Sequence, residues 1–208
     1  MKKSAICFFL TMLLASGLGL AKTPNFYFTL GIGKPMSPTD MKTNYLSGAH
    51  VGLMAGLPVA KRMEMVADFG FQMAIFDVRD FRSTLPVSNE GKDYVIKGNN
   101  AVFFTGMLKT KFIMSSDNDG KHVAYLFAGP GFVYSKTGSI QWLIDDENLS
   151  DGQIASASKT SLGATFGLGV ELKMEATIFM AELGAILGFS DESTLVLTPI
   201  RLGLALKP

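Results

Sequence analysis

A strict alternation of apolar with small or polar residues is the feature that most constrains this chain. Over residues 161–173, every even position is apolar, and every odd position is glycine, a hydroxyl residue or a charged residue. Alternate side chains of a β-strand leave opposite faces, so this segment predicts a strand with one wholly apolar face.

The same period of two recurs along the chain. It is clear at residues 26–33, 48–57, 63–76, 177–189 and 200–207, and weaker at residues 101–113 and 122–134. Long connections at 34–45, 77–99 and 136–159 alternate with short ones at 58–62, 115–120 and 173–176. We therefore predict about eight antiparallel strands in up-and-down order. Gly129-Pro130-Gly131 lies inside one of them, where we expect a β-bulge that bends the wall.

The chemistry of the two faces separates a membrane barrel from a soluble sheet. The non-apolar face is mostly glycine with isolated charges of both signs, whereas a solvent-exposed face normally carries many polar residues. Glycine and isolated charges suit the narrow interior of an eight-stranded barrel, whose apolar exterior then faces lipid. We predict an all-β, antiparallel transmembrane barrel, with a soluble exported barrel or sandwich as the alternative.

The N-terminal segment predicts export. Lys2 and Lys3 precede an apolar run over residues 6–14, and small residues follow up to Ala21. This is the pattern of a cleaved signal peptide over residues 1–21, with an uncleaved anchor as the alternative, and it leaves residues 22–208 as the barrel domain. Cleavage would remove Cys7, the only cysteine. The 19 basic and 18 acidic residues nearly balance, which gives no electrostatic reason to expect nucleic acid as a partner.

With its signal peptide, eight alternating segments and the stretches FYFTLGIG at 26–33 and FAGPGFVY at 127–134, the chain resembles the small outer-membrane barrels related to OmpA and OmpX. The resemblance implies an outer-membrane location, with outer-membrane lipid and the barrel-insertion machinery as partners. Barrels of this family usually end on an aromatic residue, whereas this chain ends Leu206-Lys207-Pro208.

Charged residues at inward-facing positions form the main candidate site. Four acids and four bases are expected in the lumen: Glu64, Asp68, Glu171, Glu182, Lys109, Lys111, Lys173 and Arg201. An unpaired buried charge is costly, so this balance favours a plug of ion pairs over an ion-conducting path lined by both signs.

A second candidate site is the loop 136–159, which carries the only tryptophan, Trp142, followed by Ile144, Asp145 and Asp146. This apolar and acidic cluster predicts either an adhesion surface for an unknown extracellular ligand or a strand extension packed on its neighbour.

The histidines decide whether an enzyme is expected. Only His50 and His122 are present, and His122 lies beside a short turn, away from the long loops. His50 faces inward, and we expect it to be satisfied by a neighbour rather than to be catalytic. The sequence predicts a non-enzymatic structural or surface-interaction protein without a cofactor, with a narrow porin-like pore as the alternative and a lipid-modifying enzyme less favoured.

Overall fold

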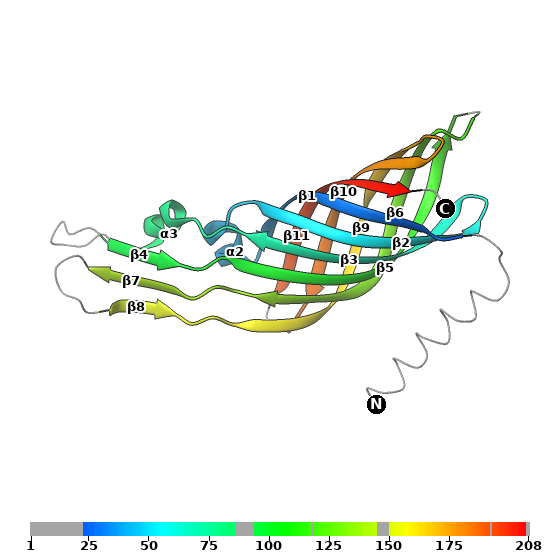
Figure 1. The fold of residues 1–208 in the computed structure, drawn as a ribbon. Helices are drawn as coiled ribbons and strands as arrows, with labels where there is room; N and C mark the ends of the chain where they lie inside the picture. The colour runs from blue at the N-terminus through cyan, green and yellow to red at the C-terminus, as the bar shows by residue number, and fades with distance from the viewer. Residues whose placement is uncertain (1–22, 86–93, 118, 145–149, 192, 207–208) are drawn as a thin grey trace.

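Eight antiparallel strands close into a barrel in the computed structural model, which describes residues 23–85, 94–117, 119–144, 150–191 and 193–206 (Figure 1). Around the barrel the strand order is β1-β11-β10-β9-β6-β5-β3-β2, which is an up-and-down order closed by β1 on β11. The predicted fold class is therefore confirmed. The barrel strands are β1 (Asn25–Ser37), β2 (Gly48–Ala60), β3 (Met63–Ala74), β5 (Ala101–Ser116), β6 (His122–Lys136), β9 (Ser158–Lys173), β10 (Thr177–Phe189) and β11 (Thr194–Leu206).

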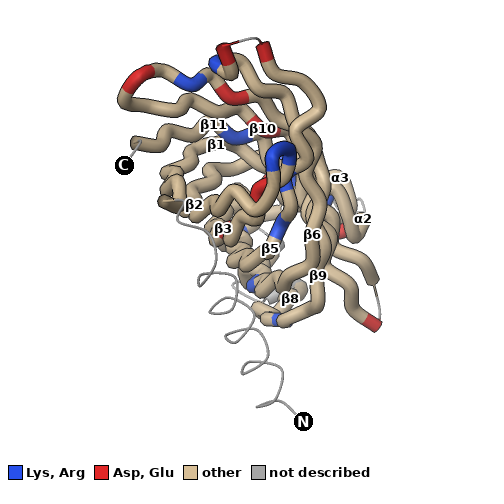
Figure 2. Tube along the Cα trace, turned by 90° about the vertical axis from the view of Figure 1, so that its right-hand side faces the viewer, with Lys and Arg blue, Asp and Glu red and all other residues tan. Residues whose placement is uncertain are grey.

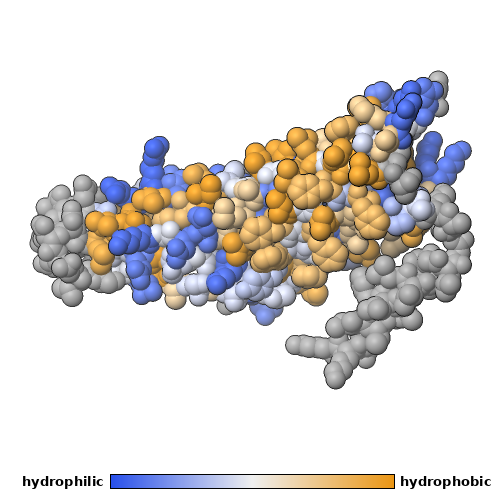
Figure 3. Space-filling model, in the orientation of Figure 1, coloured by the Kyte–Doolittle hydropathy of each residue, from blue (hydrophilic) through white to orange (hydrophobic). Residues whose placement is uncertain are grey.

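The apolar face of each strand forms the outside of the barrel, as the alternation predicts. In β9, Leu168 is 53% exposed, whereas Thr165 and Glu171 at odd positions are buried. Figure 3 shows the resulting apolar surface over the barrel wall, with hydrophilic residues gathered toward its two ends. No helix among the described residues is long and apolar enough to cross a membrane. A closed strand wall with an apolar exterior is the surface of a membrane-spanning barrel. Its exposed apolar residues include Phe26, Phe28, Leu30, Ile32, Leu53, Phe69, Phe104, Leu126, Phe132, Leu162, Phe166, Leu183, Ile200, Leu202 and Leu204.

Glycines on the inner face make room for large side chains of the neighbouring strand. A Cβ atom on Gly167 would lie 2.5 Å from Cζ of Phe127, and one on Gly169 would lie 2.5 Å from the Tyr125 hydroxyl oxygen. Both rings are buried. The interior is therefore filled by side chains, as expected for a barrel of eight strands.

One end of the barrel extends into a small sheet. Strands β4 (Tyr94–Gly98), β7 (Ile140–Ile144) and β8 (Ser150–Ile154) pair in the order β4-β7-β8 and lie beyond the barrel in Figure 1. Two short helices, α2 (Thr39–Asn44) and α3 (Val78–Thr84), lie at the same end. The carboxylate of Asp77 caps α3 by accepting hydrogen bonds from the backbone N–H groups of Arg79 (2.9 Å) and Asp80 (3.2 Å).

These elements correct the sequence-based loop boundaries. The segments 34–45, 77–99 and 136–159 were expected to be loops, yet each contributes strand or helix to the extension. Their apolar residues explain the difference, because Met41, Phe81 and Ile140, one from each segment, are buried in one cluster with Phe103 and Leu197 from the barrel wall. Tertiary burial therefore orders segments whose local pattern is that of loops.

The predicted bulge at Gly129-Pro130-Gly131 is wrong. The ladder between β5 and β6 is interrupted between the pairs Met107–Gly131 and Thr110–Ala128, but the register is the same on both sides. The pairing of this segment with β9 is continuous. Proline removes a hydrogen-bond donor without inserting a residue, so the strand keeps its register. Register shifts occur instead at Pro35/Ser37, Pro58/Ala60, Ile113/Ser115 and Trp142/Leu143.

Candidate functional site

Four charged side chains meet in the middle of the barrel. Arg201 donates from Nη1 to Oδ2 of Asp68 (2.8 Å) and from Nη2 to Oε2 of Glu182 (2.6 Å). Lys109 Nζ lies 3.1 Å from Oδ2 of Asp68 and 2.9 Å from Oε2 of Glu182. These residues come from β3, β5, β10 and β11, so the contacts cross the lumen. We call Asp68, Lys109, Glu182 and Arg201 the central charge cluster.

A second group of charges lies nearer the short turns. Lys111 Nζ is 2.7 Å from Oε1 of Glu171 and 3.5 Å from Oε2 of Glu64. Lys173 Nζ is 3.7 Å from Oε2 of Glu171, but its side chain is 32% exposed and lies at the rim. We call Glu64, Lys111, Glu171 and Lys173 the rim charge cluster. The eight charges predicted from the sequence therefore occupy two groups, each with two acids and two bases.

Aromatic side chains complete both clusters. The Tyr27 hydroxyl donates to Oε1 of Glu171 (3.2 Å), and the Tyr125 hydroxyl donates to Oε1 of Glu182 (2.9 Å). Lys111 Nζ lies 4.6 Å from the centroids of both tyrosine rings, and Lys109 Nζ lies 4.5 Å from the Phe127 ring. Such cation–π contacts are stronger when the cation is desolvated.

These rings were not among the predicted lumen residues, although Tyr27, Tyr125 and Phe127 lie at alternate positions that match the inward residues of their strands. In β1 the inward positions include Thr29, and in β6 they include Val123 and Val133. The alternation of inward and outward positions along each strand was therefore the signal that could have placed these rings in the lumen.

The lumen is closed by these contacts. Seven of the eight charged residues are buried, with Lys109 at 0% and Arg201 at 3% exposure. Beyond them, toward the extended end, apolar residues fill the interior, including Phe103, Met107, Val133, Ile186 and Leu197. Figure 2 shows acidic and basic positions close together on the strands of the barrel wall. Charges held in contact and excluded from water form a plug rather than the wall of an aqueous pore.

His50 does not have the partner expected for it. Its side chain is buried, and neither ring nitrogen has a hydrogen-bond partner among the described side chains. His122 is exposed at the opposite end, with Nδ1 2.8 Å from Oδ2 of Asp117. The structure therefore brings neither histidine into a nucleophile–base arrangement. Within the described ranges, no group of three or more metal-ligating side chains could hold a metal ion.

Trp142 lies on β7 and faces the apolar cluster of the extended end. Its ring centroid is 5.6 Å from that of Phe81. The structure therefore favours the strand extension over an exposed adhesion surface for this residue. Ile144 ends β7, whereas Asp145 and Asp146 lie outside the described residues.

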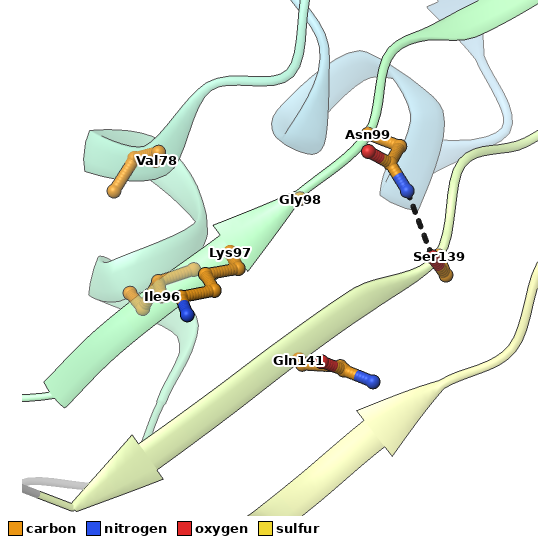
Figure 4. A pocket seen from close by; sticks show the side chains of 7 residues that line it. All are labelled: Val78, Ile96, Lys97, Gly98, Asn99, Ser139 and Gln141. Atoms are coloured by element: carbon orange, nitrogen blue, oxygen red, sulfur yellow. Dashed lines mark hydrogen bonds between the residues drawn. The ribbon is translucent and has the colours of Figure 1, made fainter.

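A small polar cavity opens in the same sheet. Its volume is about 370 Å³, and Figure 4 shows the side chains that line it: Val78, Ile96, Lys97, Gly98, Asn99, Ser139 and Gln141. The Asn99 amide donates to Oγ of Ser139 at 3.0 Å, which ties β4 to β7 beside the cavity.

Solved structures with the same fold are small outer-membrane barrels. The major outer-membrane protein of Thermus thermophilus is 14% identical with a TM-score of 0.51, covering 89% of this chain and 99% of its own. Neisserial surface protein A, from Neisseria, is 11% identical with a TM-score of 0.50, covering 90% and 100%. Ail of Yersinia pestis is 11% identical with a TM-score of 0.45, covering 88% and 96%.

No family model and no curated protein sequence matches the chain. The likeness to the first two structures therefore establishes the fold. It is the small outer-membrane β-barrel fold that the sequence resemblance implied.

Proposed function

We propose that this chain is a non-enzymatic outer-membrane protein whose sealed barrel anchors an extracellular platform, the sheet β4–β7–β8 with α2 and α3. The main support for this proposal is the combination of an apolar exterior with a lumen filled by paired charges. Leu168 is 53% exposed on the outside, whereas Lys109 is fully buried between two carboxylates inside. Such a barrel is held in lipid by its surface and offers no aqueous passage.

The packed apolar interior of the extended end supports a surface-interaction role. The rings of Phe76, Phe81 and Trp142 pack in a row, with the centroids of each neighbouring pair 5.6 Å apart. The backbone N–H of Asp77 donates to the Asn44 carbonyl oxygen at 2.8 Å, linking the segments around the two helices. Binding residues on loops held by a rigid scaffold lose less conformational freedom on binding a partner. Asp145 and Asp146 are part of this proposed interaction surface.

Export and assembly complete the proposal. Residues 1–21 act as a signal peptide that is cleaved after about Ala21, and the insertion machinery of the outer membrane assembles residues 22–208. In an outer-membrane barrel the long connections are external and the short turns periplasmic. The extension then lies outside the cell, and the turn at Lys121 lies in the periplasm.

Cysteine labelling on intact cells tests this arrangement. The cleaved chain has no cysteine of its own, so single cysteines report unambiguously. Gln153→Cys, on exposed β8, should react with a membrane-impermeant thiol reagent, and Lys121→Cys, on an exposed turn, should react only after the cells are lysed. Labelling of Lys121→Cys but not Gln153→Cys on intact cells would reverse the orientation and refute the proposed role.

A further inference from the structure

The outward face of the small sheet carries Lys97 and Gln141 beside the apolar pair Val95 and Leu143, because the alternation changes phase between barrel and extension. In β5 and β6 the even positions face outward, as exposed Phe104 and Phe132 show. The chain is irregular at residues 99–100 and 137–139. Beyond these breaks the even positions Ile96 and Trp142 pack on the apolar cluster instead. The odd positions of β4 and β7 consequently point away from the barrel axis.

These outward positions carry an ordered set of hydrogen-bonding groups. Lys97 lies opposite Gln141, and Gln141 lies opposite Gln153, so the three form a row across β4, β7 and β8. All three are exposed. Beside this row, Asn99 and Ser139 are joined by their hydrogen bond of 3.0 Å. The cavity of about 370 Å³ is lined by Lys97, Asn99, Ser139 and Gln141 together with Val78, Ile96 and Gly98 (Figure 4).

The chemistry of this face indicates an anionic, hydroxyl-rich ligand. Carboxamides both donate and accept hydrogen bonds, so Gln141 and Gln153 can each engage a sugar hydroxyl. Lys97 has no carboxylate within ion-pair distance among the described residues, which leaves its ammonium free for a phosphate or carboxylate. The cavity volume lies within the usual range of small-ligand sites.

The place of this face favours one source for such a ligand. It continues the lipid-facing wall beyond the end of the barrel. Strand β4 immediately precedes β5 and strand β7 immediately follows β6, and both lie on the same side of the molecule as these barrel strands (Figure 1). In Figure 3 the continuous apolar wall gives way to a mixture of hydrophilic and apolar side chains along this extension. Headgroups of adjacent lipids in the outer leaflet would therefore stand beside Lys97 and Gln141.

We propose that the β4–β7 face binds the phosphorylated sugar headgroup of an outer-leaflet glycolipid. Lys97 pairs with the phosphate, while Gln141 and Gln153 hydrogen-bond the sugar hydroxyls. The inference deepens the proposed function and rests on it, because the extension must lie on the outer side of the membrane. Binding from the outer leaflet would hold the platform at the membrane surface beside its lipid neighbours.

Titration with a soluble headgroup tests the site without a membrane. The probe is a deacylated, phosphorylated glycolipid oligosaccharide, added to the full mature chain in detergent and followed by calorimetry. Lys97→Gln should weaken binding about tenfold or more, since it removes a charge-assisted hydrogen bond. Lys121→Gln is the matched control, because Lys121 is an exposed lysine on a turn at the other end, and binding should be unchanged.

Two further arms identify the ligand chemistry. The unmodified chain should bind the dephosphorylated oligosaccharide more weakly than the phosphorylated one. Lys97→Gln should bind the two oligosaccharides with equal affinity. Glycerol phosphate, the headgroup fragment of an anionic phospholipid, should bind far more weakly than the oligosaccharide. Equal binding by the unmodified chain and Lys97→Gln, absence of oligosaccharide binding, or equal affinity for glycerol phosphate would each overturn the proposal. The labelling experiment fails or succeeds independently, because this titration does not depend on orientation.

Discussion

Arg201 and Glu182 face each other across the β10–β11 pair and form an ion pair with 2.6 Å between Nη2 and Oε2. Asp68 and Lys109 join this pair from the opposite wall, so one salt-bridge cluster connects strands from both sides of the lumen. Because all four side chains are excluded from water, each depends on the others for the stabilisation of its charge.

The first prediction concerns this dependence. Arg201→Met leaves Asp68 and Glu182 with only Lys109 as a cationic partner, and should lower the free energy of unfolding by about 3–5 kcal/mol. Denaturant-induced unfolding in detergent measures the loss. The double variant Arg201→Met/Asp68→Leu retains the Lys109–Glu182 pair at 2.9 Å and should recover much of the stability. No recovery would mean that the cluster is not a set of compensating pairs.

The second prediction tests the outer face. Leu168 is 53% exposed on the lipid-facing wall, and Leu168→Arg should cost about 2–4 kcal/mol if the site lies near the bilayer midplane. Leu168→Phe keeps an apolar side chain and should unfold at nearly the unmodified midpoint in lipid vesicles. Equal stability of Leu168→Arg and Leu168→Phe would contradict the contact with lipid.

The third prediction separates two inward-facing glycines. A Cβ on Gly167 would lie 2.3 Å from the Leu183 carbonyl oxygen, so Gly167→Ala should destabilise the barrel by about 1–3 kcal/mol through overpacking. A Cβ on Gly188 would have its nearest neighbour, Val133 Cβ, at 3.4 Å, which is an ordinary contact. Gly188→Ala should therefore cause no loss of stability. The same unfolding assay compares them, and similar losses would argue against the packing described here.

The fourth prediction uses the single tryptophan as a reporter. Phe81 packs on Trp142 at 5.6 Å, so Phe81→Ala should expose the indole and shift its fluorescence emission to longer wavelength. Val78→Ala, a substitution on the same helix at an exposed position, is the control and should leave the spectrum unchanged. An unchanged spectrum for Phe81→Ala would contradict the packed platform.

The fifth prediction concerns acid pH at the turn after β5. Hydrogen bonding to His122 lowers the pKa of Asp117, whose carboxylate also accepts from the backbone N–H groups of Lys121 and His122. A lowered pKa means that these contacts are fully present above the unfolded value, about 3.9, and are lost as pH falls through the folded value. The protection of the Lys121 amide against exchange, taken relative to its intrinsic rate at each pH, should fall over that acidic interval. Asp117→Asn should abolish the pH dependence, and its persistence in that variant would assign it to another group.

The two faces of the barrel could be predicted from local pattern alone, because the period of two separates Leu168 from Gly169 without knowledge of any partner strand. The lumen charges could be predicted for the same reason. Their pairing could not, because the contact of Lys109 with Glu182 depends on how strands distant in sequence oppose each other across a closed barrel.

The extended end was harder to predict for a physical reason. The short strand β7 has no stability by itself, and its order comes from burial of Trp142 against Phe81, a residue on a distant connection. The change of phase at residues 99–100 also prevents a correct assignment of Lys97. If the alternation of β5 were extended through this break, it would place Lys97 in the interior, whereas its side chain is exposed. Propensity and alternation carry no information about such long-range contacts.

The central claim is that paired charges seal the lumen, and planar-bilayer recording tests it most directly. The reconstituted mature chain should show no steady conductance above that of the lipid alone, because Lys109, Lys111, Glu182 and Arg201 are buried in contact with partners and apolar residues close the extended end. Stable conductance steps in the unmodified chain, with an ion selectivity that changes in Arg201→Met, would contradict the plug and establish a pore.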